Sequence, residues 1–432
     1  MSSTPSKPSK SDAPMLSISA APPGVRRVIA LSNAFQLLFG LLFWLPIFYV
    51  YQRRIGLSDP QIFGIQSIYY VVFCLLEIPT GLFADRFDYR RSVRAGAVVL
   101  AVANLMPIIL SSYTGFLAHF VLIALARSLV SGAFSAYLYD YLNARGAKDI
   151  YRAAEGRGRA YSLIGRVACL PVAGWLMEWL PAAPYWLSAA SAAGAAFIAL
   201  RLPEVALADG SSAPAAPERL PMARLMRHAL HQLREAPHLP MLMLQGVALF
   251  TLVRIVQVNL FQPILGSKQL PLSTFGLIMA GTTVCEIAGA FRSGWLRRWF
   301  SNRTAVFVLT WTMALALAAL VPAGSAGTVV ALCVFSVASG LSFPIQRQLL
   351  NDAIVDSTTR ATLLSMESIV DRGVCAVVAV FLGDYIAQGR LHDFLVRAAL
   401  ATAALMALTA VGLRLTDRRA GRGAHGEQNL PA

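Results

Sequence analysis

Charged residues are scarce in this sequence. Only 14% of its 432 residues are Asp, Glu, Lys or Arg, whereas a soluble domain carries about 25%. Hydrophobic residues make up 56% of the chain, and the mean hydropathy is +0.59. They fall in uncharged runs that are long enough to cross a bilayer. The composition therefore excludes an ordinary soluble domain and indicates a membrane protein with many spans.

Motifs for catalysis and metal binding are missing too. The sequence contains no Walker phosphate-binding motif, no nucleophile placed beside a base, and no cluster of metal ligands. We therefore predict that the protein is not an enzyme, is not driven by ATP, and needs no cofactor or metal. Cysteine is also rare, and we interpret the five cysteines as small core residues because all lie in apolar runs without a pairing pattern. They are Cys74, Cys169, Cys285, Cys333 and Cys375.

Acidic residues are outnumbered by basic ones. Lys and Arg total 37 against 22 Asp and Glu, a net charge of +15. Such an excess can indicate nucleic-acid binding, but here it concentrates in the N-terminal stretch, alternate loops, the linker and the tail. The opposite loops hold only Arg53, Arg54, Lys268 and Arg390. By the positive-inside rule we expect both termini in the cytoplasm, a location in the inner (plasma) membrane, and no nucleic-acid partner.

Twelve runs are predicted to be transmembrane helices. They lie at about 28–50, 61–84, 95–112, 115–141, 158–180, 183–202, 239–266, 272–296, 304–323, 327–351, 361–386 and 391–414. We predict an all-α membrane protein with twelve transmembrane helices in two six-helix halves, residues 27–202 and 238–416. Residues 203–237 form a predicted cytoplasmic linker with a basic amphipathic helix. Residues 1–26, predicted to be disordered and to contain no signal peptide, and residues 417–432 are tails.

The two predicted halves resemble each other in sequence. Glu77-Ile-Pro-Thr-Gly81 is echoed by Glu286-Ile-Ala-Gly289, and Ser131-Gly132 is echoed by Ser339-Gly340. Both pairs have nearly the same separation along the chain and lie in the same span of each half. Six spans on each side of a linker are typical of secondary transporters built from two parallel repeats.

The segment between the second and third spans, residues 81–91, is short and strongly charged. It resembles the loop between helices 2 and 3 of the major facilitator superfamily of transporters, whose pattern is Gly, three residues, Asp, Arg, any residue, Gly, Arg, and then Arg or Lys. The matching residues are Gly81, Asp85, Arg86 and Arg90. Asp88 stands where the family has its second Gly, and Tyr89 replaces an Arg.

Two further features resemble the same superfamily. Arg127, near the middle of the fourth span, is similar to the helix-4 arginine that precedes a Gly-Ala step in the family. The fifth span contains Pro171-Val-Ala-Gly174, which keeps only the Pro and one Gly of the exporters' helix-5 step. The second half lacks an acidic loop of this kind. Together with the twelve spans, these features extend the resemblance over residues 28–414.

The resemblance implies a secondary transporter that works by alternating access. We predict proton-coupled efflux of a small organic molecule, such as a drug or a siderophore-like metabolite, because the second span resembles that of exporters. The alternatives are proton-coupled uptake of an organic anion or siderophore, and a membrane sensor or enzyme on the same scaffold that moves no solute. The expected partners are the substrate, protons and membrane lipid, and we expect a monomer.

In this superfamily helices 1, 4, 7 and 10 line a central cavity. By resemblance the predicted substrate-binding residues are Asn33, Gln36, Trp44, Arg127, Tyr137, Arg254, Gln257, Ser339, Phe343 and Gln346. Arginines with amides and aromatic rings suit an anionic or chelating organic molecule. Arg127 and Arg254 lie at similar depths in opposite halves, so we expect them to hold one anionic group between them.

Four acids lie within the predicted spans and are candidates for proton coupling: Glu77, Glu286, Glu367 and Asp371. Glu367 and Asp371 are four residues apart and share one helix face, so mutual repulsion would favour a proton on one of them. We rank Glu77 first and Asp371 second. The alternative is that the acids pair structurally with the deep bases Arg127, Arg166, Arg254 and Arg372. Arg347, near an inner helix end, is predicted to snorkel towards water.

The charged segment at 81–91 is a predicted gate, with Gly81, Asp85, Arg86, Arg90 and Asp140 as its residues. The Asp85 carboxylate would meet the positive N-terminal end of the eleventh span near Thr358–Ala361. Arg86 and Arg90 would reach Asp140. Such a clamp would hold the inner side closed in one state of the transport cycle.

Overall fold

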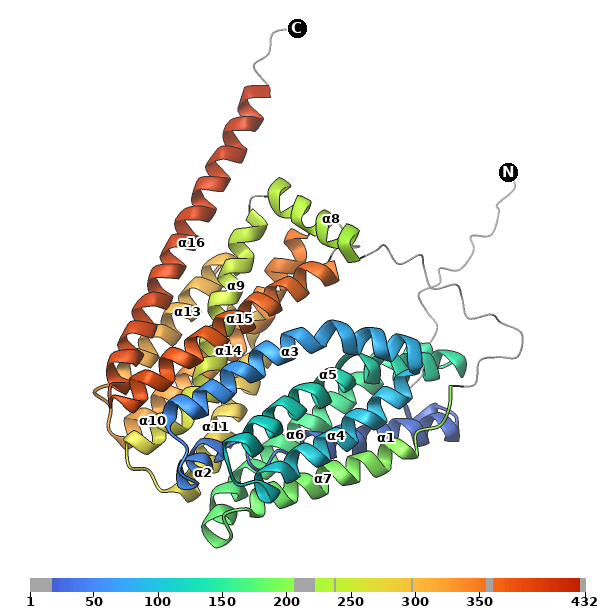
Figure 1. Ribbon diagram of the computed structural model, residues 1–432. Coiled ribbons are helices and arrows are strands. Elements are labelled where there is room, and N and C mark those ends of the chain that lie inside the picture. The colour runs from blue at the N-terminus through green and yellow to red at the C-terminus, as the bar shows by residue number, and fades with distance from the viewer. Residues whose placement is uncertain (1–17, 206–221, 237, 297, 355–359, 428–432) are drawn as a thin grey trace, which may run out of the picture.

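The computed structural model describes residues 18–205, 222–236, 238–296, 298–354 and 360–427 (Figure 1). Within these ranges some side chains, including those of residues 81–87 and 417–427, are not described. All regular secondary structure in the described ranges is helical, which confirms the predicted all-α fold. Each of the twelve predicted spans coincides with one helix or with a broken helix.

The first six spans form the N-terminal half. Its short 3-10 helices are η1 (Ile18–Ala20) and η2 (Lys148–Ile150). Its longer helices are α1 (Pro23–Gly40), α2 (Phe48–Arg54), α3 (Asp59–Phe87), α4 (Tyr89–Ile109), α5 (Tyr113–Ala144), α6 (Tyr151–Trp179) and α7 (Ala183–Leu200). The first span is broken, because residues 41–47 between α1 and α2 are not helical. Pro46 lies in this break and has no N–H to donate to a preceding turn.

The last six spans form the C-terminal half, preceded by α8 (Met222–Glu235) in the linker region. The seventh span consists of α9 (His238–Arg254), a π-helical stretch η3 (Ile255–Leu260) and α10 (Phe261–Ser267). The others are α11 (Leu272–Phe291) with α12 (Ser293–Leu296), α13 (Asn302–Ala319), α14 (Ser325–Ala353), α15 (Arg360–Ala387) and α16 (Leu391–Glu427). Helix α16 thus continues beyond residue 416, where the sequence predicted the start of a tail.

Several helices begin at the polar residues expected of N-caps. The signal Ser58-Asp59-Pro60 lies at the start of α3: Ser58 precedes the first residue of the helix, and its N–H donates to Oε1 of Gln61 at 2.9 Å. Ser301 caps α13 by accepting from the Thr304 N–H at 3.2 Å. These bonds satisfy backbone and side-chain groups that the first helical turn leaves without partners.

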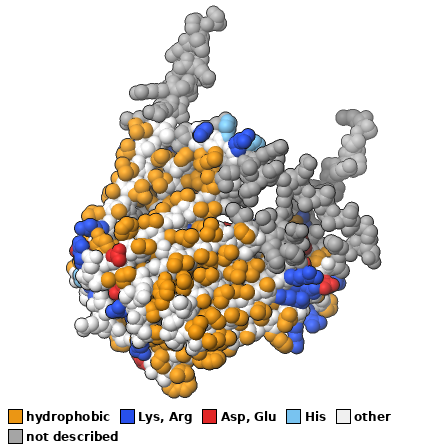
Figure 2. Space-filling view, in the orientation of Figure 1, with side chains coloured by type: hydrophobic (Ala, Val, Ile, Leu, Met, Phe, Trp, Pro, Cys, Tyr) orange, Lys and Arg blue, Asp and Glu red, His pale blue; other side chains and the backbone are white. Residues whose placement is uncertain are grey.

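Among the described residues, ten helical stretches are long and apolar enough to cross a membrane. The two remaining predicted spans are not among these ten, because each is too short or too polar locally. Helix α1 ends at Gly40, where the first span breaks, and α15 carries Glu367, Asp371 and Arg372 in its middle. Figure 2 shows hydrophobic side chains over the middle of the visible face, with Lys and Arg gathered towards its margins. This is the surface expected of a protein surrounded by lipid.

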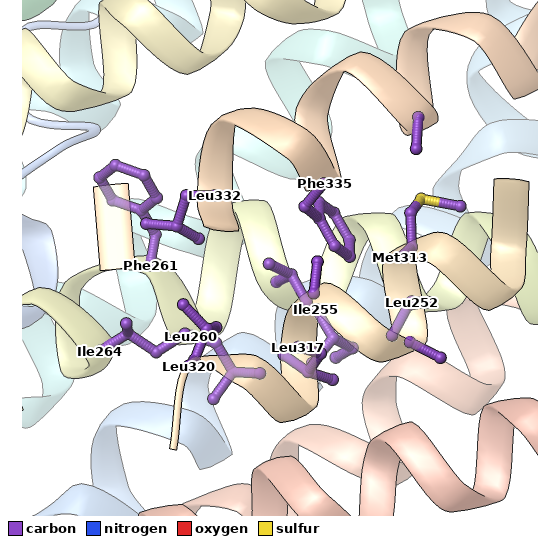
Figure 3. Close-up of a cluster of buried hydrophobic side chains, with 14 of the residues drawn as sticks. Leu252, Ile255, Leu260, Phe261, Ile264, Met313, Leu317, Leu320, Leu332 and Phe335 are labelled. Atoms are coloured by element: carbon purple, nitrogen blue, oxygen red, sulfur yellow. The ribbon is translucent and has the colours of Figure 1, made fainter. Parts of the chain in front are cut away.

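Each half has its own packed interior. In the N-terminal half, α4 packs against α5 and α7, and α1 packs against α6 and α7. In the C-terminal half, α14 packs against α11 and α13, while α9 contacts α15 and α16. The largest cluster of buried apolar side chains surrounds the π-helical stretch, with Leu252 and Ile255 near Leu317 and Leu260 near Leu320 (Figure 3).

Two helix pairs join the halves: α3 packs along α15, and α6 packs along α11. Glycine permits the close approach. A Cβ on Gly276 of α11 would overlap the Leu170 carbonyl of α6, and a Cβ on Gly174 of α6 would overlap the backbone of Leu272. Both sites lie where α6 ends and α11 begins, opposite α8. We call this side the far end, and the side with α8, the α3–α4 turn and the end of α16 the linker end.

A buried amide ties the halves together at the far end. Oε1 of Gln262 on α10 accepts from the backbone N–H groups of Tyr49 and Val50, at 2.9 and 3.3 Å. Its Nε2 donates to the Leu45 carbonyl at 3.1 Å. Towards the linker end the two groups of helices diverge (Figure 1). The structure is therefore closed between the halves at the far end.

Candidate functional site

A small cavity lies between the two halves. It has a volume of about 130 Å³. The N-terminal half contributes Leu45 and Arg166, and the C-terminal half contributes Gln257, Glu286 and Phe335 among others. One wall therefore carries a guanidinium and the opposite wall a carboxylate with an amide, which makes the cavity suitable for a polar organic molecule.

A second cavity of about 230 Å³ lies beside the first, inside the C-terminal half. Gln257 and Glu286 line both cavities. The remaining lining residues include Arg254, Ser339, Phe343, Arg347 and Asp371. Of the ten predicted substrate-binding residues, the structure thus brings four together here, namely Arg254, Gln257, Ser339 and Phe343.

Glu286 and Gln257 contact each other across helices α11 and η3. Gln257 Nε2 donates to Oε2 of Glu286 at 2.8 Å. Glu286 forms no salt bridge with any cation that the structure describes. The π-helical turn around Gln257 widens the helix, and such turns occur often at functional sites. Glu286 is therefore an acid that faces a cavity with a neutral partner.

The N-terminal half offers two arginines near this cavity. Arg166 on α6 lines it, and its Nε is buried without a hydrogen-bond partner. Arg127 on α5 is close enough for the two positive charges to repel each other. Neither arginine has an ion pair or hydrogen bond within the described parts of the chain. An anionic group entering the cavity would meet Arg166, with Arg127 nearby, and neither guanidinium is held in an ion pair among the described residues, although the Glu286 carboxylate lines the same cavity.

Arg254 is engaged differently from the prediction. Its Nε and Nη2 both donate to Oδ2 of Asp371, at 3.2 and 2.7 Å. Oδ1 of the same carboxylate accepts from Thr251 at 3.0 Å. In this state Arg254 is held by Asp371 through Nε and Nη2, so the predicted clamp of Arg127 and Arg254 on one anion is not formed here and stays a prediction.

The pairing of Glu367 also differs from the prediction. Oε2 accepts from Nη1 of Arg347 at 2.7 Å. The Arg347 guanidinium lies 4.9 Å from the ring centroid of Phe250 and its side chain is partly exposed, so its predicted snorkelling towards water stays a prediction. Glu367 and Asp371 each have their own arginine, and therefore the mutual repulsion inferred from their spacing is offset by two cations.

Glu77 forms an ion pair between the halves. Arg372 on α15 donates from Nη1 to Oε2 of Glu77 on α3 at 2.9 Å. The guanidinium also lies 3.9 Å from the ring centroid of Phe73. This ion pair joins α3 and α15, the helices that pack along each other between the halves. Loss of Glu77 would therefore disturb the packing of the halves as well as any proton transfer.

Besides Arg127, five of the predicted substrate residues line neither cavity. The Trp44 indole donates to Oδ1 of Asn104 at 2.8 Å within an aromatic cluster of the N-terminal half. The Tyr137 hydroxyl donates to the Pro203 carbonyl at 2.9 Å. Gln346 is fully buried and donates from Nε2 to the Leu242 carbonyl at 2.8 Å. These contacts give Trp44, Tyr137 and Gln346 a place in helix packing. The fourth, Gln36, lies beside Gly158.

Asn33 is the remaining predicted substrate residue. It is buried on α1, and its Oδ1 has no hydrogen-bond partner among the described residues. It lines neither of the two cavities. Its contact with substrate stays a prediction.

At the predicted gate, Arg90 pairs with Glu204 just after α7 rather than with Asp140. Its Nη1 also donates to the Leu202 carbonyl at 3.5 Å. Asp140 forms no ion pair that the structure describes. The hydrogen bond and positive charge of Arg90 lower the pKa of the Glu204 carboxyl. The side chains of Gly81, Asp85 and Arg86, and residues 355–359 opposite them, lie outside the described residues, so their part in a gate stays a prediction.

Asp88 occupies an unusual backbone position between α3 and α4. Its φ is 96° and its ψ is 127°, a region that favours glycine. Its Oδ1 accepts from the Arg90 N–H at 3.1 Å and caps α4. The family pattern has Gly at this position, so the presence of Asp88 in this sequence was a signal of backbone strain at the turn.

Sequence reasoning missed Gln262 and did not place Arg166 in the substrate site. Both are polar residues inside apolar runs, which was the available signal. Their partners could not be read from the sequence, because Gln262 bonds to residues more than 200 positions away. All five cysteines are free thiols in the structure; Cys169 and Cys375 are buried core residues as interpreted, whereas Cys74, Cys285 and Cys333 are only partly buried.

The chain is similar to known transporters. The nucleoside transporter NupG has a TM-score of 0.74 and 14% identity, covering 90% of this chain and 99% of that chain. A POT family transporter in complex with a thioalcohol-conjugated peptide has a TM-score of 0.68 and 11% identity, covering 91% and 96%. A bacterial homologue of the human lysosomal transporter Spinster has a TM-score of 0.66 and 16% identity, covering 92% and 97%. At these identities the likeness shows the fold alone.

A search of curated proteins finds no match. The family model described as Major Facilitator Superfamily, however, matches residues 29–366, which is most of the chain. The fold, with its two groups of six spans, agrees with that match. The chain therefore belongs to the Major Facilitator Superfamily and is a multi-pass membrane transporter of that family, not an enzyme.

Proposed function

We propose that this transporter moves a small organic anion out of the cell and couples its movement to protons. The observation that carries the proposal is Arg166, which lines the cavity between the halves and has Arg127 near it; neither arginine forms a salt bridge with a carboxylate among the described residues. Arginine recognises carboxylates and phosphates through its planar fork. Gln257 and Glu286 on the opposite wall would hold the polar remainder of the same molecule.

The size of the cavities supports a small substrate. Their volumes of about 130 and 230 Å³ are below the roughly 300–1,000 Å³ of pockets for drug-sized ligands. The similar structures include proteins named as nucleoside and peptide transporters, whose named substrates are also small and polar. A large amphipathic drug fits this site less well.

For proton coupling we propose Glu286 as the first candidate among the four acids. Glu77, Glu367 and Asp371 each pair with an arginine at 2.9 Å or less. Glu286 accepts from the neutral Gln257 and forms no salt bridge among the described residues. Proton uptake by Glu286 therefore breaks no salt bridge, whereas protonation of the others would leave a cation without its partner.

The orientation proposed from the basic loops places the linker end in the cytoplasm. Contacts between the halves at the far end then make this the inward-open state. Export requires that the substrate binds from this side and leaves after the far end opens. Uptake by proton symport is the second candidate, and the partial helix-5 motif, with Pro171 but a single Gly, favours it.

Transport in proteoliposomes with an imposed pH gradient tests the proposal. A panel of small carboxylates and phosphates would be screened against cationic and neutral compounds of equal size. We expect uphill movement of an anion and a loss of at least tenfold in Arg166→Gln and Arg127→Gln, but not in the exposed control Arg54→Gln. Transport of cations alone, or full activity in both variants, would refute anion recognition by these arginines.

A further inference from the structure

The C-terminal half carries a long apolar groove on its lipid-facing side. The groove has a volume of about 430 Å³ and lies between α9, α15 and α16. Each helix contributes a stripe of residues at spacings of three and four, such as Val370, Val374 and Val378 on α15. The groove belongs neither to the cavity between the halves nor to the predicted substrate residues.

The shape of the groove suits a hydrocarbon chain. Its lining on α15 extends from Val370 to Tyr385, about 22 Å at a rise of 1.5 Å per residue. Half of a bilayer's hydrocarbon core is about 15 Å thick. The groove is therefore long enough for most of one acyl chain lying along the membrane normal.

One charged residue lines the groove, at its far end. Arg397 lies on α16 beside Phe394, with its guanidinium 5.7 Å from the ring centroid of Tyr385. It is exposed and has no salt bridge with a described carboxylate. The nearest acid on its helix, Asp393, already pairs with Arg390 at 3.0 Å, and the exposed Asp384 does not bond to Arg397.

An unpaired arginine inside a membrane-spanning helix is costly unless it reaches an anion or water. Arg397 lies six residues after the start of α16, about 9 Å along the helix. From that depth its side chain extends to the level of the lipid headgroups. The charge is therefore placed where a phosphate of the surrounding bilayer lies.

We propose that this groove binds one anionic glycerophospholipid, with an acyl chain along α9, α15 and α16 and the headgroup phosphate on Arg397. The arginine fork donates two hydrogen bonds to phosphate oxygens. The apolar residues of the three helices pack against the acyl chain through van der Waals contacts. Arg397 at one end complements an anionic headgroup, and the remaining lining is apolar. These two features fit a phospholipid better than a helix of another protein.

The groove adjoins the transport site through one residue. Thr251 lines the groove and donates to Oδ1 of Asp371 at 3.0 Å. Asp371 in turn holds Arg254, which lines the cavity in the C-terminal half. A lipid in the groove would therefore pack against the support of the Arg254–Asp371 pair and would favour the state in which this pair is formed.

Binding is measured on the purified full-length protein in detergent, by thermal unfolding during titration with phosphatidylglycerol. Phosphatidylcholine and inorganic phosphate are titrated in parallel. We expect phosphatidylglycerol to raise the unfolding temperature saturably, and the other two to bind at least tenfold more weakly. Equal affinity for phosphatidylcholine would overturn the anionic selectivity, and equal affinity for inorganic phosphate would overturn the role of the chain.

Three variants separate this site from general lipid attraction. Arg397→Gln removes the phosphate contact, Val374→Trp fills the groove, and Arg414→Gln removes an exposed arginine at the other end of the same membrane span. We expect the first two to weaken phosphatidylglycerol binding at least tenfold and the third to leave it unchanged. If all three bind like the wild type, or all three lose binding equally, no specific lipid site exists here.

Discussion

At the scale of single residues, Asp88 shows how a departure from a family pattern marks strain. The family has Gly where this chain places a side chain at φ 96°. Such a conformation costs about 1–3 kcal/mol, while exchanging an Asp cap for Gly costs only about a few tenths of a kcal/mol. We therefore expect Asp88→Gly to stabilise the protein by about 1–2 kcal/mol in thermal unfolding.

The control for that substitution is Asp88→Ala. Alanine keeps the strain and loses the cap to the Arg90 N–H, so this variant should be less stable than the wild type. Equal stability of the Gly and Ala variants would mean that the strain at this turn does not matter, and equal stability of Asp88→Ala and the wild type would mean that the cap does not.

The ion pair of Glu204 with Arg90 at the linker end should make the stability of the fold depend on pH. Arg90 lowers the pKa of the Glu204 carboxyl through a hydrogen bond and through charge. Because the folded pKa lies below the unfolded value, the contact stabilises the fold above the unfolded pKa of about 4.3 and is lost as pH falls through the folded value. Glu204→Gln should lower the unfolding temperature at pH 7 and match the wild type near pH 3. The exposed control Asp149→Asn should follow the wild type throughout; a constant offset for Glu204→Gln would contradict the linkage.

Glu286 and Glu77 should fail in different ways. Glu286→Gln keeps the hydrogen-bond geometry with Gln257 and removes a titratable group, so we expect loss of accumulation driven by a pH gradient but normal exchange at equilibrium.

Glu77→Gln leaves Arg372 without its carboxylate, and we expect lower yield and stability. The double variant Glu77→Gln, Arg372→Gln should recover stability, since no buried charge is left unpaired.

Both transport assays are made in vesicles of matched protein content. Uphill accumulation by Glu286→Gln would exclude this residue as the coupling site. Full stability of Glu77→Gln would show that its ion pair with Arg372 has no structural role.

At the scale of helices, the sequence predicted where each span lies but not how the spans are broken. Long apolar runs locate spans because a helix satisfies its backbone hydrogen bonds in lipid within one continuous segment. Pro46 is a local signal for a break in the first span, but neither the extent of the break at 41–47 nor the π-helical turn at 255–260 follows from the apolar pattern. Likewise the acids and arginines were found as deep charges, but the choice of partner, such as Arg347 for Glu367, was set by packing.

Gly246 on α9 tests how tightly α9, α14 and α15 are packed. A Cβ at this position would collide with Oε1 of Glu367 and crowd Nε2 of Gln346. We expect Gly246→Ala to destabilise the protein by about 1–3 kcal/mol, because overpacking forces buried groups apart. Gly281→Ala on α11 meets nothing within 4 Å and is the matched control. Comparable stability of the two variants would show that Glu367 has room to move.

At the scale of the whole molecule, the predicted fold class was confirmed while the state of the molecule could not be predicted. A repeat of six spans indicates two similar halves, but the sequence does not say which ends of the halves are in contact. Here glycine contacts such as Gly276 with Leu170, and the amide of Gln262, close the far end. Alternating access requires these same contacts to separate.

Gln262 therefore offers a way to shift the balance between states. Gln262→Leu removes three hydrogen bonds across the halves and leaves the Tyr49 and Val50 N–H groups without that acceptor. An unsatisfied buried group costs about 1–3 kcal/mol, and 1.4 kcal/mol is about tenfold in a population ratio. We expect the far end to open in a much larger fraction of molecules.

The measurement is a distance distribution between spin labels at Arg54→Cys and Gly266→Cys, exposed positions at the far end of opposite halves. The five native cysteines are first replaced by Ala or Ser. Gln52→Leu is the matched control, since this buried amide has no hydrogen-bond partner in the described structure and its loss breaks no contact between the halves. Gln262→Leu should add a longer distance that Gln52→Leu does not. Identical distributions in the wild type and both variants would mean that the far end is held closed by helix packing, and that the amide is not part of the gate.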